Sequence, residues 1–146
     1  MKRGWIIVLA LFLVACRAES LKSSIDKDKL TVGFLVMDGV YNTEFTAPWD
    51  IFHHTQFRDG IQAMNVFSVG VEPGTVTTFE GVQFQPDYTI SSDDLPQIDV
   101  LVVPSAEHHL DTDLDNVAMI DFVRKTAQNA QSVSYTHLTL PTTPYV

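Results

Sequence analysis

Residues 30–52 read LTVGFLVMDGVYNTEFTAPWDIF, and this stretch decides the fold of the chain. Residues 32–37 form an apolar run with two valines and a phenylalanine, which predicts a strand buried on both faces. The Asp38-Gly39 pair predicts a turn, and a helix is expected from Asn42 or Thr43, since either side chain can cap it. A strand, a turn and a helix in this order are typical of an α/β protein.

The helix is expected to turn an aromatic stripe toward the sheet. Phe45, Trp49 and Phe52 recur at intervals of four and three residues, which places them on one face. Pro48 lies inside this pattern and predicts a kink, or a second helical start capped by Thr46.

Two kinds of polar residue stand out on this helix. Glu44 lies near its start in an otherwise aromatic segment, so its charge calls for an explanation. His53 and His54 are predicted to close the helix, where histidine suits the dipole. Neighbouring residues of a helix point about 100 degrees apart, so the two histidines are poorly placed to share a metal ion.

The first sixteen residues are predicted to be a bacterial lipoprotein signal. Lys2 and Arg3 precede the apolar residues 5–15, a run too short for a bilayer span of about 20 residues but suited to a secretory signal of about 7 to 15. Residues 13–16, LVAC, resemble the lipobox, whose cysteine becomes the lipidated first residue of the mature protein. An uncleaved N-terminal anchor or a buried start is the alternative interpretation.

Cys16 is therefore the predicted lipid attachment site, and a membrane is the predicted partner. A lipoprotein cysteine carries the two or more acyl chains that stable anchoring requires. Arg17, where an aspartate could stand, favours by family analogy the periplasmic side of the outer membrane in a diderm bacterium. Residues 17–29, rich in serine and alternating charges, are expected to be a solvated tether.

Composition excludes several classes of function. A chain of 146 residues with 45% hydrophobic content suits one globular domain. Cys16 is the only cysteine, so the folded part offers no disulfide, cysteine metal cluster or thiol nucleophile. Without the signal, 7 basic and 18 acidic residues leave a formal charge of −11, which disfavours binding to nucleic acid or anionic membrane surfaces through charge.

Two more β segments are predicted in the middle of the chain. Residues 65–70 form a second short strand. Residues 75–79 and 82–86, separated by Glu80-Gly81, predict a hairpin at the edge of the sheet, where Pro86 ends the pairing.

Residues 98–103 predict another buried strand, followed by the polar loop 104–109 at the carboxyl end where open α/β sheets place their sites. A helix is expected to begin at Asp113 or Asp115 and to end at Arg124-Lys125. These elements predict a mostly parallel sheet with helices on both faces, an incomplete flavodoxin-like or Rossmann-like sandwich with an edge hairpin.

The chain is expected to change character after a further strand near Ser132. Residues 134–146 have no charged side chain, four threonines and two prolines, and they resemble translated sequencing-adapter ends. We expect a non-native tail, with a genuine extended C-terminal strand as the alternative. The expected divisions are a signal at 1–16, a tether at 17–29, the N-terminal part of an α/β domain at 30–133 and the tail at 134–146.

Three sequence blocks, in this order and at this separation, resemble the DJ-1/PfpI superfamily of class I glutamine-amidotransferase-like α/β proteins. They are FLVMDGV at residues 34–40, TAPWDIF at 46–52 and DVLVVP at 99–104. The nearest resemblance is to the branch shared by the N-terminal domains of AraC-type regulators and the isocyanide hydratases.

The resemblance implies a role for Glu44. In the family, the acidic residue at this position lies beside a cysteine on a strand-to-helix elbow, and it either hydrogen-bonds the thiolate or acts as general base. A carboxyl beside a thiolate is often protonated, because two adjacent negative charges repel each other. The elbow cysteine is expected within a few residues of Ser132 and is absent, which predicts a chain cut short before its catalytic centre and an inactive fragment.

The resemblance also implies that the loop after the buried strand 98–103 lines the site. Family members usually carry Pro-Gly-Gly there, with backbone amides that face the site. This chain has Pro104-Ser105-Ala106, so Ser105 and Ala106 are the candidate substrate-loop residues. Their side chains replace the two glycines of the family, and this departure disfavours a close approach of the backbone to a substrate.

The same loop allows two other interpretations. Ser105 with His108 resembles a hydrolase pairing, but a third, orienting group is not evident. Glu107, His108, Asp111 and Asp113 could suggest a metal loop, although acidic residues before a helix are more often caps. We therefore expect neither a metal nor a cofactor.

Three functions remain open at this point. The intact parent is expected to be a lipid-anchored protein with a cysteine-centred site: a hydrolase, a hydratase or a redox-protective protein. The alternative is a noncatalytic module of the cell envelope that senses a small molecule, like the ligand domain of AraC-type regulators. A third reading is a dimerising envelope component, since a homodimer is possible for the parent. A DNA-binding regulator is disfavoured, because an exported acidic chain cannot meet a promoter.

Overall fold

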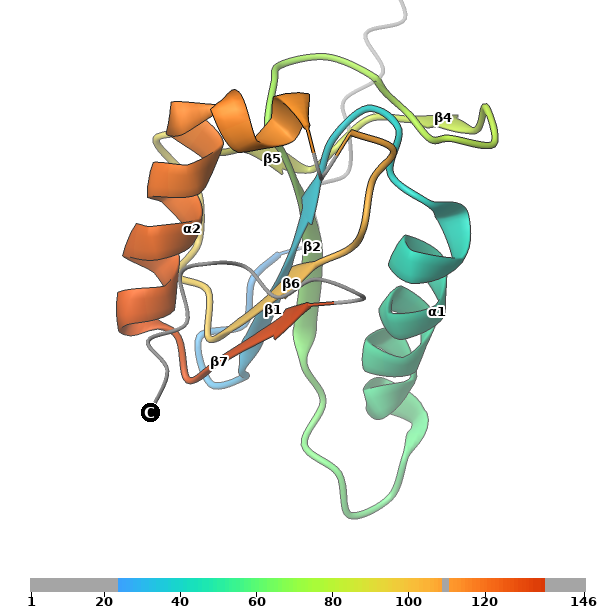
Figure 1. Ribbon diagram of the computed structural model, residues 1–146. Helices are drawn as coiled ribbons and strands as arrows, with labels where there is room; N and C mark the ends of the chain where they lie inside the picture. The colour runs from blue at the N-terminus through green and yellow to red at the C-terminus, as the bar shows by residue number, and fades with distance from the viewer. Residues whose placement is uncertain (1–23, 109–110, 136–146) are drawn as a thin grey trace, which may run out of the picture.

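The computed structural model describes residues 24–108 and 111–135. Its main sheet has five parallel strands in the order β5-β2-β1-β6-β7, with helix α1 on one face and helix α2 on the other (Figure 1). The predicted α/β sandwich is confirmed. In chain order the elements are β1 (Thr31–Val36), α1 (Asn42–His53), the 3-10 turn η1 (His54–Phe57), β2 (Asn65–Gly70), β3 (Val76–Thr77), β4 (Gln83–Phe84), β5 (Tyr88–Thr89), β6 (Val100–Val103), the 3-10 turn η2 (Thr112–Asp115), α2 (Val117–Asn129) and β7 (Ser132–Tyr135).

Several predictions fall outside the described residues. These are the signal, the lipobox with Cys16, the tether as far as residue 23, the loop residue His109 and the tail beyond residue 135.

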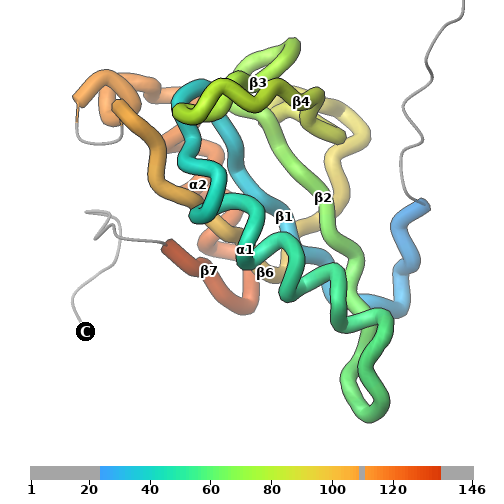
Figure 2. The backbone as a smooth tube through the Cα atoms, turned by 90° about the vertical axis from the view of Figure 1, so that its right-hand side faces the viewer, coloured from blue at the N-terminus to red at the C-terminus, as the bar shows by residue number. Residues whose placement is uncertain are grey.

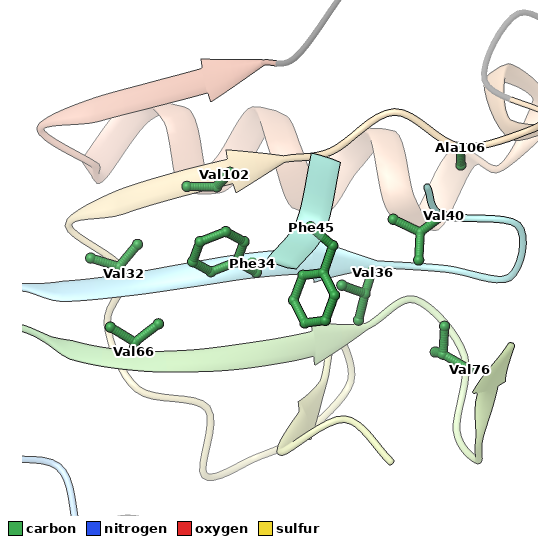
Figure 3. Close-up of a cluster of buried hydrophobic side chains, with 9 residues drawn as sticks. All are labelled: Val32, Phe34, Val36, Val40, Phe45, Val66, Val76, Val102 and Ala106. Atoms are coloured by element: carbon green, nitrogen blue, oxygen red, sulfur yellow. The ribbon is translucent and has the colours of Figure 1, made fainter. Parts of the chain in front are cut away.

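Strand β1 lies at the centre of the sheet, between β2 and β6, and all six of its residues are buried. It begins and ends one residue earlier than the predicted run. Val32, Phe34 and Val36 pack in the cluster on the α1 face (Figure 3), whereas Leu35 packs in the cluster on the other face. This alternation is the one that strand geometry imposes on successive side chains.

Helix α1 packs its aromatic stripe on one residue of β1, as predicted. The Phe34 ring lies 5.8 Å from Phe45, 5.2 Å from Trp49 and 6.0 Å from Phe52, measured between ring centroids, and all three pairs are edge-to-face. Such pairs contribute about 0.5–1.5 kcal/mol each beyond the burial of their area. The helix is therefore fixed on the sheet by a single aromatic cluster.

The predicted cap of α1 is wrong. Tyr41 occupies the N-cap position, and the Asn42 N–H donates to the Glu80 carboxylate of the hairpin at 3.0 Å. The second helical start predicted at Thr46 is also wrong, because the helix is continuous through Pro48 and the Thr46 hydroxyl donates to the Asn42 carbonyl.

The predicted hairpin exists, but it does not extend the main sheet. Strands β3 and β4 pair antiparallel over two residues each and form a separate small sheet. It lies over the carboxyl ends of β1 and β2 (Figure 2), with the Phe84 ring stacked on Phe45 at 5.0 Å. The edge position that we expected for the hairpin belongs to β5, which pairs with β2 directly after Pro86 and was not predicted.

The second helix begins later and ends later than predicted. Asp113 and Asp115 lie in η2, and α2 starts at Val117 with the Asn116 side chain accepting from the Met119 N–H at 3.0 Å. An asparagine cap explains this start better than the acidic residues do. The helix continues to Asn129, a turn beyond the predicted end.

The strand predicted near Ser132 is confirmed as β7, which pairs in parallel with β6. It includes Ser134 and Tyr135, the first two residues of the segment that we assign to the tail. Within the described residues, no helix has the length and apolar character needed to cross a membrane.

Candidate functional site

Strands β1, β6 and β7 reach the same edge of the sheet at one level. Val102 of β6 pairs with Phe34 of β1 on one side and with Ser134 of β7 on the other. Because the three strands are parallel, the segments that follow them meet at this edge, which is where open α/β sheets place their sites. Glu44 follows β1, and Ser105 follows β6.

Three backbone segments join at this edge, and we call them the collar: residues 39–41, 77–79 and 105–107. On its hairpin side, the Gly39 N–H donates to the Thr77 carbonyl at 2.8 Å, and the Phe79 N–H donates to the Val40 carbonyl at 3.0 Å. The Thr77 N–H also donates to the Asp38 carboxylate at 2.7 Å. The hairpin is thus bound to the segment that connects β1 to α1.

The other side of the collar binds the same segment to the loop after β6. The Glu107 N–H donates to the Gly39 carbonyl at 2.9 Å, and the Tyr41 N–H donates to the Ser105 carbonyl at 3.0 Å. Residues 39–41 therefore lie between two flanking segments, in the way that a central strand lies in a sheet.

Glu44 lies in the first turn of α1, three residues after Tyr41. Its residue is partly exposed, but its carboxyl oxygen Oε2 is shielded from solvent. The collar fixes the backbone just before Glu44.

Ser105 and Ala106, the predicted substrate-loop residues, are both buried, with 2% and 0% of their surface exposed. Ala106 forms an isolated bridge with Val40, and both side chains belong to the core cluster (Figure 3). In this arrangement the two residues hold the collar together, and contact with a substrate would require a covering segment to move.

The polar end of the loop is organised separately. His108 lies 3.7 Å from the Glu107 carboxylate and 3.6 Å from the Asp111 carboxylate, and about half of its side chain is exposed. Ser105 is buried, so a substrate cannot reach its hydroxyl as it would reach the nucleophile of a Ser-His pair. In the described part of the chain, no three His, Cys, Asp or Glu side chains are grouped to hold a metal ion.

A pocket of about 250 Å³ lies at the carboxyl ends of β1 and β2, on the side of α2. Met37, Asp38 and Val71 line it from the sheet, and Asn116 and Met119 line it from the first turn of α2. Besides apolar side chains, its lining contains several polar and charged ones, among them Glu72, His108 and Asp113.

The histidine pair at the far end of α1 takes no part in this edge. The Trp49 and His53 rings lie 4.8 Å apart. Burial lowers the pKa of His53 below its ordinary value; the carboxylates of Asp87 and Asp50 oppose this effect, and the adjacent His54 adds to it.

Sequence reasoning missed Glu80 and Tyr41, which connect the hairpin, the collar and α1. The one available signal was the Glu80-Gly81 pair, which predicted a turn. It did not predict that the Glu80 carboxylate accepts a hydrogen bond from the first residue of α1.

Solved structures of the DJ-1 superfamily have the same fold. A cysteine-to-alanine mutant of a DJ-1 superfamily protein from Salmonella typhimurium matches with a TM-score of 0.61 at 19% identity. Drosophila melanogaster DJ-1beta matches with 0.58 at 14%, and Toxoplasma gondii DJ-1, oxidized, with 0.56 at 17%. Each match covers 73% of this chain and 54% of the other, so this chain spans about half the length of these relatives.

No curated protein matches the chain. The sequence model of the DJ-1/PfpI family matches residues 30–135, from the residue before β1 to the last residue of β7. This match covers all the strands and helices described above, and it agrees with the strand order and with the similar structures. The chain belongs to the DJ-1/PfpI family.

Proposed function

We propose that this chain carries the acidic half of a cysteine-centred site in a lipid-anchored protein, with Glu44 as the acidic partner. The observation that supports this most is the location of Glu44, in the first turn after the central strand and directly beyond the collar, with Oε2 shielded from solvent. The reaction class is hydrolytic, hydratase-like or redox-protective. The 146-residue chain itself is inactive, since its single cysteine, Cys16, precedes the domain.

The nucleophile belongs, in this proposal, to the residues that follow β7 in the parent protein. Strand β7 is next to β6 and ends at the same edge as β1. A thiol in the turn after β7 would lie at that edge with Glu44 and the collar. The Salmonella typhimurium protein among the similar structures was solved with one cysteine replaced by alanine, and a cysteine in that protein is consistent with this proposal.

The contiguous gene beyond the codon for Val133 tests this location. We expect it to encode a cysteine within about ten residues, then a small residue and a helix, as at a strand-to-helix elbow. An open reading frame that continues for a full α/β domain without such a cysteine would refute the cysteine-centred site.

Lipid anchoring through Cys16 is the second part of the proposal, and it rests on the signal and lipobox at residues 1–16. Cys16→Ala is expected to abolish lipidation and to leave the protein as uncleaved or soluble precursor. The measurement is metabolic labelling with a radioactive fatty acid followed by membrane fractionation. Equal labelling of the variant would show that the lipid is elsewhere.

A noncatalytic sensing module is the second candidate, and the pocket beside α2 favours it. This pocket of about 250 Å³ can hold a small molecule without any nucleophile. A ligand bound there would raise the melting temperature of the wild-type chain. Met119→Trp, which fills the pocket, would abolish that shift. If Glu44→Leu abolished the shift and Met119→Trp did not, the ligand would bind at the collar instead.

A further inference from the structure

The start of α1 raises the question of what Glu44 does in the helix itself. The first N–H groups of a helix lack intrahelical partners, and a glutamate at the third helical position often bends back to bond the N-cap N–H. With Tyr41 at the N-cap, Glu44 is this third residue. A purely structural capping role for Glu44 is therefore the rival to a role in the site.

Other segments already serve two N–H groups at this helix start. The Tyr41 N–H, to which a capping glutamate would bond, donates to the Ser105 carbonyl at 3.0 Å. The Asn42 N–H donates to Glu80 Oε2, also at 3.0 Å. The cap of α1 thus comes from two loops far away in the sequence, and a carboxylate from Glu80 suits the positive end of the helix dipole.

The turn that carries Glu80 is well fixed. The Thr78 N–H donates to the Val82 carbonyl at 2.9 Å, and the Val82 N–H returns to the Thr78 hydroxyl at 3.0 Å. The Phe79 ring lies 5.1 Å from the Tyr41 ring. The hydrogen bond from the Asn42 N–H to the Glu80 carboxylate therefore adds a contact between the hairpin side of the collar and the first turn of α1.

We propose that Glu80 is a positioning residue, whose carboxylate holds the first turn of α1 and thereby keeps the Glu44 carboxyl aimed into the site. This inference rests on the proposed function of Glu44, because positioning matters only if Glu44 faces a reacting group. Glu80 itself touches no substrate. It acts through the Asn42 N–H and the helix that begins there.

The test uses NMR on the full 146-residue chain, labelled with ¹⁵N and with ¹³C at the glutamate carboxyls. In Glu80→Ala, the Asn42 amide is expected to exchange with solvent about fivefold faster or more, because it loses its acceptor. The Glu44 carboxyl signal is expected to move at the same time. Glu80→Gln keeps an oxygen acceptor, so it is expected to restore both signals to near their wild-type values.

Glu72→Ala is the matched control, since Glu72 is an exposed glutamate on the neighbouring connection between β2 and β3. It removes the same charge, and both signals are expected to stay unchanged. If the Asn42 amide exchanges at the same rate in Glu80→Ala as in the wild type, the inference is overturned. Faster exchange without movement of the Glu44 signal would reduce Glu80 to a plain helix cap and would also overturn it. Neither NMR result depends on a thiol. Failure of the positioning role of Glu80 can therefore be told apart from failure of the proposed cysteine-centred site.

Discussion

The collar depends on one residue with a backbone geometry that glycine adopts most readily. Gly39 has φ +78°, and its N–H and carbonyl bind the two flanking segments. A Cβ added there would lie 3.1 Å from the Glu107 Cβ, so a side chain would press on the loop after β6. The turn predicted at Asp38-Gly39 is thus also the point where the hairpin and the loop after β6 are hydrogen-bonded to the segment between β1 and α1.

Gly39→Ala is therefore expected to lower the free energy of unfolding by about 1–2 kcal/mol from its positive φ, and by more from the contact with Glu107. Gly60→Ala is the control, because Gly60 has φ +76° with no atom within 4 Å of the added Cβ. Urea denaturation measures both. Equal losses in the two variants would show that the collar does not confine this position.

His53 predicts a pH dependence. Burial lowers its pKa in the folded chain below the value of about 6.5 in the unfolded chain, so the unfolded chain binds protons more readily. The stabilisation is present above pH 6.5 or so and is lost as the pH falls through the folded pKa. His53→Gln is expected to flatten the decrease in melting temperature between about pH 7.5 and 5.5. His54→Gln should keep most of the wild-type slope, because His54 is the smallest of the causes that act on the pKa of His53. A curve that His54→Gln flattens as much as His53→Gln does would make His54 the source.

Between elements, the contact that decides stability is the one between β1 and α1. Phe34 is fully buried and meets three aromatic rings of the helix. This contact places the first turn of α1, and with it Glu44, over the central strand. The periodicity of apolar residues can reveal this contact, because Phe34 and the aromatic stripe of α1 both lie within residues 30–52.

Phe34→Ala is expected to lower the free energy of unfolding by about 3–5 kcal/mol, because it leaves a cavity among the rings. Phe57→Ala removes an equal ring that is 73% exposed, and it should change stability little. Chemical denaturation followed by tryptophan fluorescence measures both variants. A loss below about 1 kcal/mol for Phe34→Ala would contradict this packing.

The elements that the sequence predicted and those that it missed differ in the range of their contacts. Strands β1, β2 and β6 follow from local apolar runs, and the stripe of α1 follows from its period. Strand β5 is only two residues long and is defined by its pairing with β2, which no local pattern encodes. The caps of α1 come from Glu80 and Ser105, so local capping rules named Asn42 or Thr43 instead.

For the whole molecule, the sequence resemblance anticipated the family and a mostly parallel sheet with helices on both faces, but neither the strand order nor the collar. The family motif identified Glu44 and the loop at Ser105 and Ala106 separately. Only the fold shows that the loop at Ser105 is hydrogen-bonded to residues 39–41, which lie shortly before Glu44, and that the two loop residues are buried. The central proposal for the whole protein is that Glu44 serves a thiol at this edge of the sheet.

The most direct measurement is the rate of thiol alkylation against pH in the protein translated from the contiguous gene, comparing wild type with Glu44→Leu. We predict that Glu44→Leu lowers the alkylation rate near neutral pH by about tenfold or more and moves the profile to higher pH, because the thiolate loses its partner. Asp50→Asn, which removes a carboxylate from the other end of α1, should leave the profile unchanged. A Glu44→Leu profile that superimposes on that of the wild type would contradict a role for Glu44 beside the thiol.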